Sequence, residues 1–308
     1  MELHAPRRLE LDISPALAGR TVDTLLRNVL KLSGTTVKRA KAAPGGILLD
    51  GRPVFVHVAC RAGQRLSVVV GDMTSGGAVL PTPGPLDIVF EDADLLILNK
   101  APGVAVHPGP GHHSDTLGNF IMEYYKNTGQ TVRFRPVHRL DRGTSGLLCV
   151  AKHAHAQEVL KAQLHTPAFR RVYLSVCEGL PAPTRGVIDA PIGRADSSAI
   201  KREIRQDGAP ARTRYEVLKS TGGRSLVRLE LETGRTHQIR VHMAALGHPL
   251  TGDFLYGTED AALISRPALH ASALSLLHPV SGRALAWSAP LPDDMAALIE
   301  RPDISPLR

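Results

Sequence analysis

Residues 135–152 read RPVHRLDRGTSGLLCVAK and set a single carboxylate, Asp141, between Arg139 and Arg142. The GTSG that follows favours a tight turn, and the apolar LLCVA after it predicts a strand that runs into the core. A neighbouring arginine favours the ionised form of a carboxylate. The stretch therefore indicates a reactive acid at the mouth of a strand, although on residue type alone an aspartate is more often a solvated or turn residue.

Around this stretch the sequence mixes short strands with fewer helices. In residues 225–234, Val227, Leu229 and Leu231 fall on one face of a strand and charged residues on the other. Further strands are expected at 86–100 (two strands around an acidic turn), 147–152, 170–179 and 211–219, and helices near 115–127, 153–165 and 234–247. Strands with irregularly interspersed helices predict an α+β fold with a mixed, largely antiparallel sheet rather than regular βαβ units.

The N-terminal part of the chain contains the apolar pattern of a helix. From Thr21, apolar residues at i+1, i+4, i+5, i+8 and i+9 predict an amphipathic helix that Thr21 can cap. A second helix at 33–43 holds three basic residues close together, and two strands follow, the first ending in a turn at Asp50-Gly51. Helices followed by small strands, with basic residues on the second helix, are typical of a compact RNA-binding domain. A small domain whose lysines are merely solvated explains the same residues equally well.

A change of composition divides the chain in two. Residues 75–85, SGGAVLPTPGP, are rich in Gly and Pro and lack periodicity, so they predict a linker. We expect a small domain at 1–75, a linker at 76–85 and a second domain at 86–308. Residues 1–75 carry 11 Lys or Arg against 6 Asp or Glu, so this quarter of the chain holds +5 of the net +8 charge. The small domain is the part best suited to a polyanion.

The composition indicates a globular protein. The chain has 308 residues with 43% hydrophobic content, no apolar run of signal-peptide length, and no segment near the roughly 18 apolar residues of a membrane helix. Three cysteines without paired spacing favour a reducing, cytoplasmic setting. Phosphate loops, dinucleotide fingerprints, nucleophile elbows and paired zinc cysteines are missing. The histidines that tempt a metal interpretation lack the usual ligand spacing, so we expect no metal site: His107, His112, His113, His237 and His242.

The stretch HRLDRGTSGLLCVAK closely resembles the signature of the RluA family of RNA pseudouridine synthases. RRVYLSVCEG, ARTRYEVL, LETGRTHQIRVHMAALGHPLTGDFLYG and LHASALSLLHP resemble further blocks in that family's order, and together they span most of residues 86–290. Residues 20–54 resemble the RNA-binding domain named after the fourth small-subunit ribosomal protein, which accompanies many of these enzymes. One departure is Gly34, which follows Ser33 where members of that domain family usually carry an arginine.

The resemblance implies that Asp141 is the catalytic residue of an enzyme that isomerises uridine in RNA. It implies that Tyr173 lies against the flipped base, that Arg240 pairs with the catalytic carboxylate, and that Arg139 occupies the space left in the RNA. On residue type alone, Tyr173 would be a core aromatic, Arg240 a helix-surface residue, and Arg139 a phosphate contact or a solvent-exposed side chain. The carboxylate can act as nucleophile at the anomeric carbon or as base at the neighbouring sugar position, and the sequence leaves both routes open.

This reaction involves no redox step and no metal, so we expect no cofactor. The expected partner is RNA, with the RNA of the large ribosomal subunit favoured and transfer RNA as the alternative, and we expect a monomer. Two rival hypotheses remain: a catalytically silent RNA-binding protein on the same fold, and a metal-dependent hydrolase built on the histidines.

Overall fold

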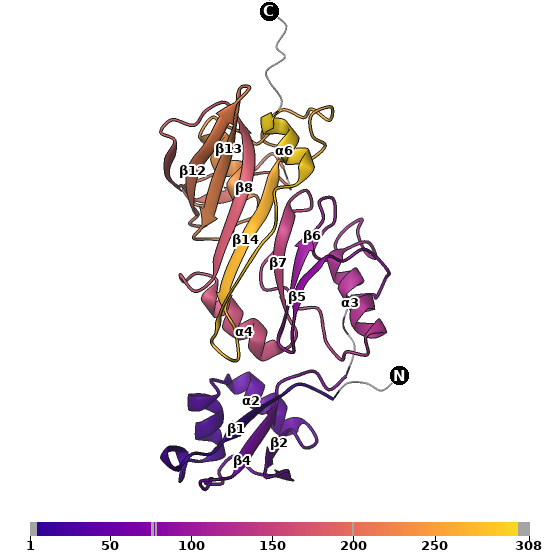
Figure 1. The fold of residues 1–308 in the computed structure, drawn as a ribbon, viewed down its shortest axis with the longest axis vertical. Coiled ribbons are helices and arrows are strands. Elements are labelled where there is room, and N and C mark those ends of the chain that lie inside the picture. The colour runs from indigo at the N-terminus through magenta and orange to yellow at the C-terminus, as the bar shows by residue number, and fades with distance from the viewer. Residues whose placement is uncertain (1–4, 75–76, 78, 199, 301–308) are drawn as a thin grey trace, which may run out of the picture.

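The computed structural model describes residues 5–74, 77, 79–198 and 200–300. A four-stranded sheet lies within the first 70 residues, and a nine-stranded sheet begins at Ile88. Figure 1 shows the smaller sheet and its helices at one end of an elongated molecule. We call residues 5–74 the N-terminal unit and residues 79–300, without 199, the main unit. The expected boundaries at 75 and 85 stay a prediction, because residues 75, 76 and 78 lie outside the described residues.

The N-terminal unit packs short helices against an antiparallel sheet of order β1-β4-β2-β3. Its core is formed by the buried apolar side chains of both layers. The elements are β1 (Arg8–Asp12), the 3-10 turn η1 (Pro15–Leu17), α1 (Val22–Thr24), the π-helical turn η2 (Leu25–Val29), α2 (Gly34–Ala42), β2 (Ile47–Leu49), β3 (Arg52–Pro53) and β4 (Arg65–Val69).

The helix predicted from Thr21 is confirmed by α1 and η2. Leu25 and Leu26 of its apolar stripe are fully buried, and the backbone N–H of Thr24 donates to the Thr21 hydroxyl, which caps the helix. The second helix, α2, is likewise capped by Ser33. Both helices therefore form because one face is apolar and the first turn has a hydroxyl acceptor.

The turn predicted between β2 and β3 is also confirmed. Asp50 and Gly51 both have positive φ, 51° and 76°, the backbone that a two-residue hairpin favours and that Asp-Gly supplies. Strand β1 was not predicted, because in RLELD only Leu9 is buried and no turn signal bounds the strand on its N-terminal side.

The main unit is built on a mixed sheet of order β5-β6-β7-β14-β8-β13-β12-β9, with β15 paired to β14. All its strand pairs are antiparallel except β7 with β14. The strands are β5 (Ile88–Glu91), β6 (Leu95–Lys100), β7 (Ser145–Ala151), β8 (Arg170–Glu178), β9 (Arg185–Asp189), β12 (Arg212–Thr221), β13 (Arg224–Leu231), β14 (Leu269–Leu277) and β15 (Ala284–Ser288). The predicted α+β class with a largely antiparallel sheet is confirmed.

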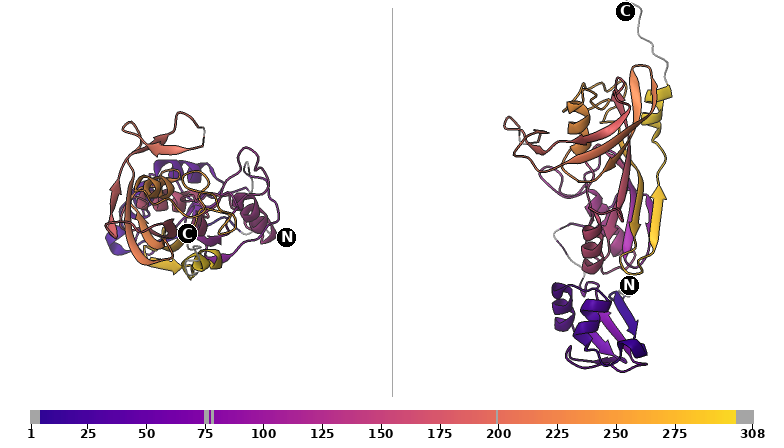
Figure 2. Two further views of the ribbon diagram at one scale, coloured as in Figure 1. Left: turned by 90° about the horizontal axis from the view of Figure 1, so that it is seen from above. Right: turned by 90° about the vertical axis from the view of Figure 1, so that its left-hand side faces the viewer.

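Helices cover both faces of this sheet. Alternate residues of β6 point to opposite faces, so that Leu96 packs in one cluster with α3 (Leu117–Asn127) and α5 (Gln238–Ala245), and Ile97 in another with α4 (Ala154–Gln163). Helix α6 (Asp293–Glu300) packs against β8, β12 and β13. The hairpin of β10 (Ile192–Arg194) and β11 (Arg202–Ile204) stands out from the sheet (Figure 2).

Ion pairs join the two units, and we call these contacts the seam. Asp72 accepts two hydrogen bonds of 2.7 Å from Arg135, and Arg7 donates to both carboxylate oxygens of Asp94 at 2.7 and 3.1 Å. Although burial raises the pKa of Asp94, hydrogen bonds from His153 and Arg7 hold it well below its usual range. The N-terminal unit is thus fixed to the main unit by buried carboxylates rather than by a shared apolar core.

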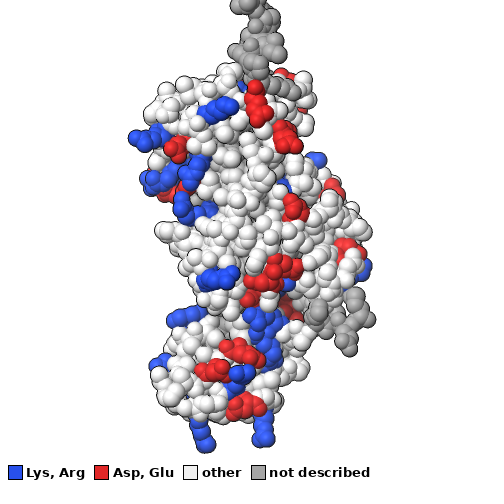
Figure 3. All heavy atoms as spheres, in the orientation of Figure 1, with Lys and Arg blue, Asp and Glu red and all other residues white. Residues whose placement is uncertain are grey.

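Figure 3 shows blue lysine and arginine side chains protruding from the N-terminal unit at the bottom of the view. None of the helices in the described part of the chain is both long and apolar enough to span a membrane.

Candidate active site

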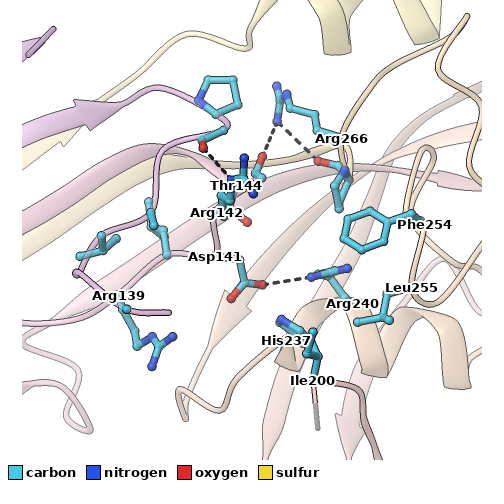
Figure 4. Close-up of a pocket in the computed structure, with 18 of the residues that line it drawn as sticks. Arg139, Asp141, Arg142, Thr144, Ile200, His237, Arg240, Phe254, Leu255 and Arg266 are labelled. Carbon is cyan, nitrogen blue, oxygen red and sulfur yellow. Dashed lines mark hydrogen bonds and ion pairs between the residues drawn. The ribbon is translucent and has the colours of Figure 1, made fainter. Parts of the chain in front are cut away.

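A cavity of about 760 Å³ opens beside Asp141, within the size range of ligand sites (Figure 4). Its walls come from segments that lie far apart in the sequence. The lining comprises Pro102, Gly103 and residues 105–109 before α3, residues 139–144 before β7, Ile200 in the β10–β11 hairpin, His237 and Arg240 at the start of α5, Phe254, Leu255 and residues 265–267 before β14, and Asp294 of α6.

We call residues 139–144 the Asp141 loop. Leu140 is buried in the core, whereas the Asp141 side chain keeps 21% exposure and faces the cavity. The predicted turn forms, because the Thr144 N–H donates to the Asp141 carbonyl at 3.1 Å. At Gly146 φ is +108°, and a Cβ there would lie 2.3 Å from the carbonyl oxygen of Ala271, so β7 can pair with β14 only with a glycine at this position.

Two buried cations hold the backbone of the Asp141 loop. The ammonium of Lys100 donates to the Arg142 carbonyl at 3.2 Å and to two carbonyls of the loop after β6, at 2.7 and 2.9 Å. Arg266 donates to the Gly143 carbonyl at 3.3 Å. The pKa of Lys100 is lowered to about 7, chiefly by burial and also by the charge of Arg266, while the charge of Asp141 opposes this shift. Sequence reasoning missed Lys100. Its one signal in the sequence is that a lysine ends a predicted strand that begins with the wholly apolar LLIL.

Arg240 is fixed by a carboxylate that sequence reasoning also missed. Asp253, which is fully buried, accepts 2.7 Å hydrogen bonds from Nε and Nη2 of Arg240, and the remaining Nη1 lies 3.7 Å from Asp141 Oδ2. Burial pushes the pKa of Arg240 down, but the hydrogen bond and charge of Asp253 raise it overall, with Asp141 adding to the rise. Arg240 is therefore a buried cation aimed at Asp141, and its interpretation as a helix-surface residue is wrong.

Known proteins similar to this chain share one activity. A sequence model of a family described as RNA pseudouridylate synthase matches residues 94–245. An uncharacterized RNA pseudouridine synthase, YhcT of Bacillus subtilis, is 38% identical over 294 residues, which cover 95% of this chain and 96% of that protein. The ribosomal large subunit pseudouridine synthase D of Nitrosomonas europaea is 39% identical, with coverage of 95% and 87%. This chain belongs to the RluA family of RNA pseudouridine synthases.

Solved structures agree with this assignment. The human RNA pseudouridylate synthase domain containing 1 matches with a TM-score of 0.56 and 28% identity, over 76% of this chain and 100% of that one. As a pseudouridine synthase, the protein is an isomerase that converts uridine in RNA to pseudouridine. The expectation of an RluA-type enzyme is confirmed.

Within this synthase, Tyr173 lies on β8, and its neighbours Val172 and Leu174 face the other way, as the alternating pattern predicted. Its side chain packs in the core cluster that also holds Leu140, and it does not line the cavity. Burial raises the pKa of Tyr173, the charge of Arg171 lowers it and that of Asp141 raises it. The role of Tyr173 against the base stays a prediction.

Arg139 differs from the buried arginines of the site, Arg240 and Arg266, because it is exposed. It lines the cavity edge, where Figure 4 shows its guanidinium extending away from Asp141. Burial of its own ring lowers the pKa of His107, another lining residue, and the charge of Arg139 lowers it further. An exposed cation at the mouth fits a contact with RNA, and its specific role also stays a prediction.

In the described part of the chain, the histidines that suggested a metal belong to no group of three or more metal-type ligands. Among the described residues, the one such group comprises Asp92, Asp94 and His278 at the seam. There the oxygens of Asp94 are already engaged by Arg7 and His153, side chains of the protein itself. This group lies outside the cavity lining and contributes nothing to the synthase site.

Proposed function

We propose that this synthase modifies uridines of the large ribosomal subunit's RNA and that Asp141 is its catalytic residue. The observation that carries the second part is the state of the two carboxylates lining the cavity. Asp294 is bound by both ends of the Arg266 fork, at 2.7 and 2.8 Å, whereas Asp141 has its nearest cation at 3.7 Å and stays open to the cavity. Asp141 is thus the cavity carboxylate that no arginine holds through two hydrogen bonds, and the guanidinium of Arg240 faces it.

The chemistry asked of Asp141 concerns the sugar of the target nucleotide. Asp141 either attacks the anomeric carbon or removes a proton from the neighbouring sugar carbon, and the bond between that anomeric carbon and uracil N1 breaks. The base then turns within the cavity and rejoins the same sugar carbon through its own C5. C5 then gives up its hydrogen to solvent as a proton, and N1 takes up a proton. A base in folded RNA has to leave its stack to reach this depth. Tyr173, whose ring is buried in this structure, is the side chain against which the flipped base is held, so the ring must become accessible when the RNA binds. Arg139 at the mouth contacts the RNA that the base has left.

The choice of ribosomal RNA rests on the relatives. Besides the Nitrosomonas europaea protein, the ribosomal large subunit pseudouridine synthase D of Escherichia coli is 42% identical over 233 residues, covering 71% of each chain. The test is to map pseudouridines in RNA from cells with and without this protein. Loss of sites in large-subunit RNA is expected, and loss confined to transfer RNA would overturn this choice of substrate.

The N-terminal unit contributes RNA affinity in this proposal. Lys38 and Lys41 of α2 are exposed, as phosphate contacts must be. Phe55, 77% exposed, stacks on His57 with ring centroids 5.7 Å apart and an angle of 12° between the rings. Exposed rings beside basic side chains are the composition of surfaces that bind single-stranded nucleic acid.

The catalytic assignment is tested by Asp141→Asn, which keeps the size of the side chain and removes its charge. The assay is tritium release from RNA labelled at uracil C5, run beside an RNA-binding titration and a folding check. We expect tritium release to stop while binding stays equal or strengthens slightly, because one negative charge is lost. Asp115→Asn, at an exposed aspartate outside the cavity, is the matched control and should release tritium normally. Release by Asp141→Asn at the wild-type rate, free of deamidation, would falsify the assignment.

A further inference from the structure

His237 is held in the cavity by an unusual backbone. It directly precedes α5 and has φ 57° and ψ 18°, the left-handed region that residues other than Gly, Asn and Asp rarely adopt. Such strain persists where the surroundings impose it, and it clusters at functional sites. The ring is half-buried and lines the cavity together with Asp141, and Figure 4 shows both on the same side as Arg240.

A tyrosine hydroxyl lies within hydrogen-bond distance of one ring nitrogen of His237. The Tyr256 hydroxyl oxygen accepts the backbone N–H of Arg202 at 2.8 Å and lies 2.9 Å from His237 Nδ1. With its oxygen engaged by Arg202, the hydroxyl is placed to donate its own hydrogen to Nδ1. In a neutral imidazole the other nitrogen, Nε2, then carries the hydrogen and is a donor.

The surroundings favour a neutral ring. Burial lowers the pKa of His237, and the positive charges of Arg240 and Arg202 lower it too, whereas Asp141 and Asp253 oppose them. The Tyr256 ring is itself fixed, because the Arg240 guanidinium lies over it, 5.1 Å from the ring centroid. The cavity therefore contains one uncharged N–H donor of defined direction beside the catalytic carboxylate.

We propose that Nε2–H of His237 donates to a carbonyl oxygen of the target uracil and holds the base while it is detached from the sugar. The proposal rests on the function proposed above, in which Asp141 acts at the sugar. When the bond between the anomeric carbon and N1 breaks, its electron pair leaves with the base. The negative charge then spreads over N1 and the two carbonyl oxygens, and a fixed N–H donor stabilises such charge without receiving or losing a proton.

The symmetry of uracil makes one donor sufficient. Replacing N1 by C5 at the sugar amounts to a half turn about the line through N3 and C6, which exchanges the C2 and C4 carbonyl groups. A donor on one wall therefore meets a carbonyl oxygen before and after the turn. In cytosine one of these two positions carries an amino group, itself a donor, so the same N–H would face a donor in one orientation. His237 would thus hold the moving base and also select uracil over cytosine.

Selection can be measured without turnover by using Asp141→Asn as the background. Two transcripts of a mapped site are compared, one with uridine and one with cytidine at the target position, and the ratio of their Kd values is recorded. We expect uridine to bind about tenfold more tightly, and His237→Leu in this background to bring the ratio close to one. His237→Asn, which tolerates the left-handed backbone and keeps a donor, should restore part of the ratio. His113→Leu, at an exposed histidine outside the cavity lining, is the matched control and should leave it unchanged.

A second measurement does not depend on replacing the histidine. Tyr256→Phe removes only the hydroxyl that fixes the ring, and we expect kcat to fall several-fold with KM little changed. Nitrogen NMR of the wild-type protein should show His237 with its proton on Nε2, and Tyr256→Phe should show a mixture of both tautomers. A uridine preference that survives His237→Leu, or a proton on Nδ1 in the wild type, overturns the proposal. Wild-type protein that forms no pseudouridine in the transcript instead contradicts the proposed substrate.

Discussion

Two buried arginine–aspartate pairs, one in the cavity and one at the seam, have nearly the same geometry and different uses. Arg135 binds Asp72 through both terminal nitrogens, at 2.7 Å each, whereas Arg240 binds Asp253 through Nε and Nη2. The second arrangement leaves Nη1 of Arg240 facing Asp141 at 3.7 Å. An arginine can therefore face a second carboxylate only if its structural carboxylate leaves one terminal nitrogen free. Which edge of the guanidinium the structural carboxylate binds decides this.

The surroundings of the two carboxylates differ as well. Asp253 is fully buried and also accepts the backbone N–H groups of Leu255 and Tyr256, at 3.0 and 3.2 Å. Asp72 attracts two further arginines, Arg39 and Arg133, which are about half exposed and lie 3.5 and 3.8 Å away. If Asp72 loses its charge, the half-exposed arginines around it can be hydrated by water. If Asp253 loses its charge, the buried Arg240 is left without its carboxylate partner.

The largest effect on stability should follow from Asp253→Asn. A buried arginine left without its carboxylate costs about 3–5 kcal/mol of unfolding free energy. Because Arg240 would then lose its orientation toward Asp141, turnover should fall along with stability. Urea unfolding and tritium release measure the two effects. The control is Asp207→Asn, which removes an exposed partner of Arg205 and should leave the unfolding free energy close to that of the wild type. Equal losses in both variants would contradict this account.

A smaller effect, on turnover more than on folding, is expected at Tyr173. Tyr173→Phe keeps the ring and should retain most activity, whereas Tyr173→Leu keeps an apolar side chain and loses the ring. Stacking of a base on an aromatic ring is worth about 1–3 kcal/mol, so Tyr173→Leu should turn over about tenfold or more slowly. RNA binding and urea unfolding show whether the loss is specific. Similar turnover in the Phe and Leu variants would make Tyr173 an ordinary core residue.

Breaking the seam should cost less. Asp72→Asn removes the charge from a carboxylate that is 3% exposed, but its arginine partners can turn toward water, so we expect a loss of about 1–2 kcal/mol. The loss should appear as faster proteolysis around residues 75–85, while an RNA too short to reach the N-terminal unit is modified at the normal rate. An unchanged cleavage rate would mean that the ion pairs do not hold the two units together.

The same contrast explains what the sequence could predict. Periodicity and caps placed α1, α2 and several main strands, because these patterns depend on neighbours two to four residues away. Helix α6 and strands β9, β10, β11, β14 and β15 were not predicted. Strands β9 and β15 alternate between exposed and half-buried residues, and β10 and β11 are only three residues long. Asp253 and Lys100 were missed for another reason, since their partners lie in other segments of the chain. The resemblance to the RluA family supplied Asp141 and Arg240, which no local pattern could pair.

The smallest effect is expected where charges are neither buried nor committed to the seam. Lys38→Gln and Lys41→Gln, on the exposed side of α2, should leave the unfolding free energy within about 0.5 kcal/mol of wild type. Each lysine that contacts a phosphate releases about one counterion, so losing it should reduce the slope of log affinity against log salt by nearly one and weaken binding uniformly across sequences. Arg27→Gln is the matched control, because Arg27 already donates to Asp23 at 2.8 Å. Binding of a large-subunit RNA fragment between 50 and 200 mM salt measures the slope. If it stays at the wild-type value in both lysine variants, α2 is a solvated surface and the N-terminal unit binds RNA through another face or not at all.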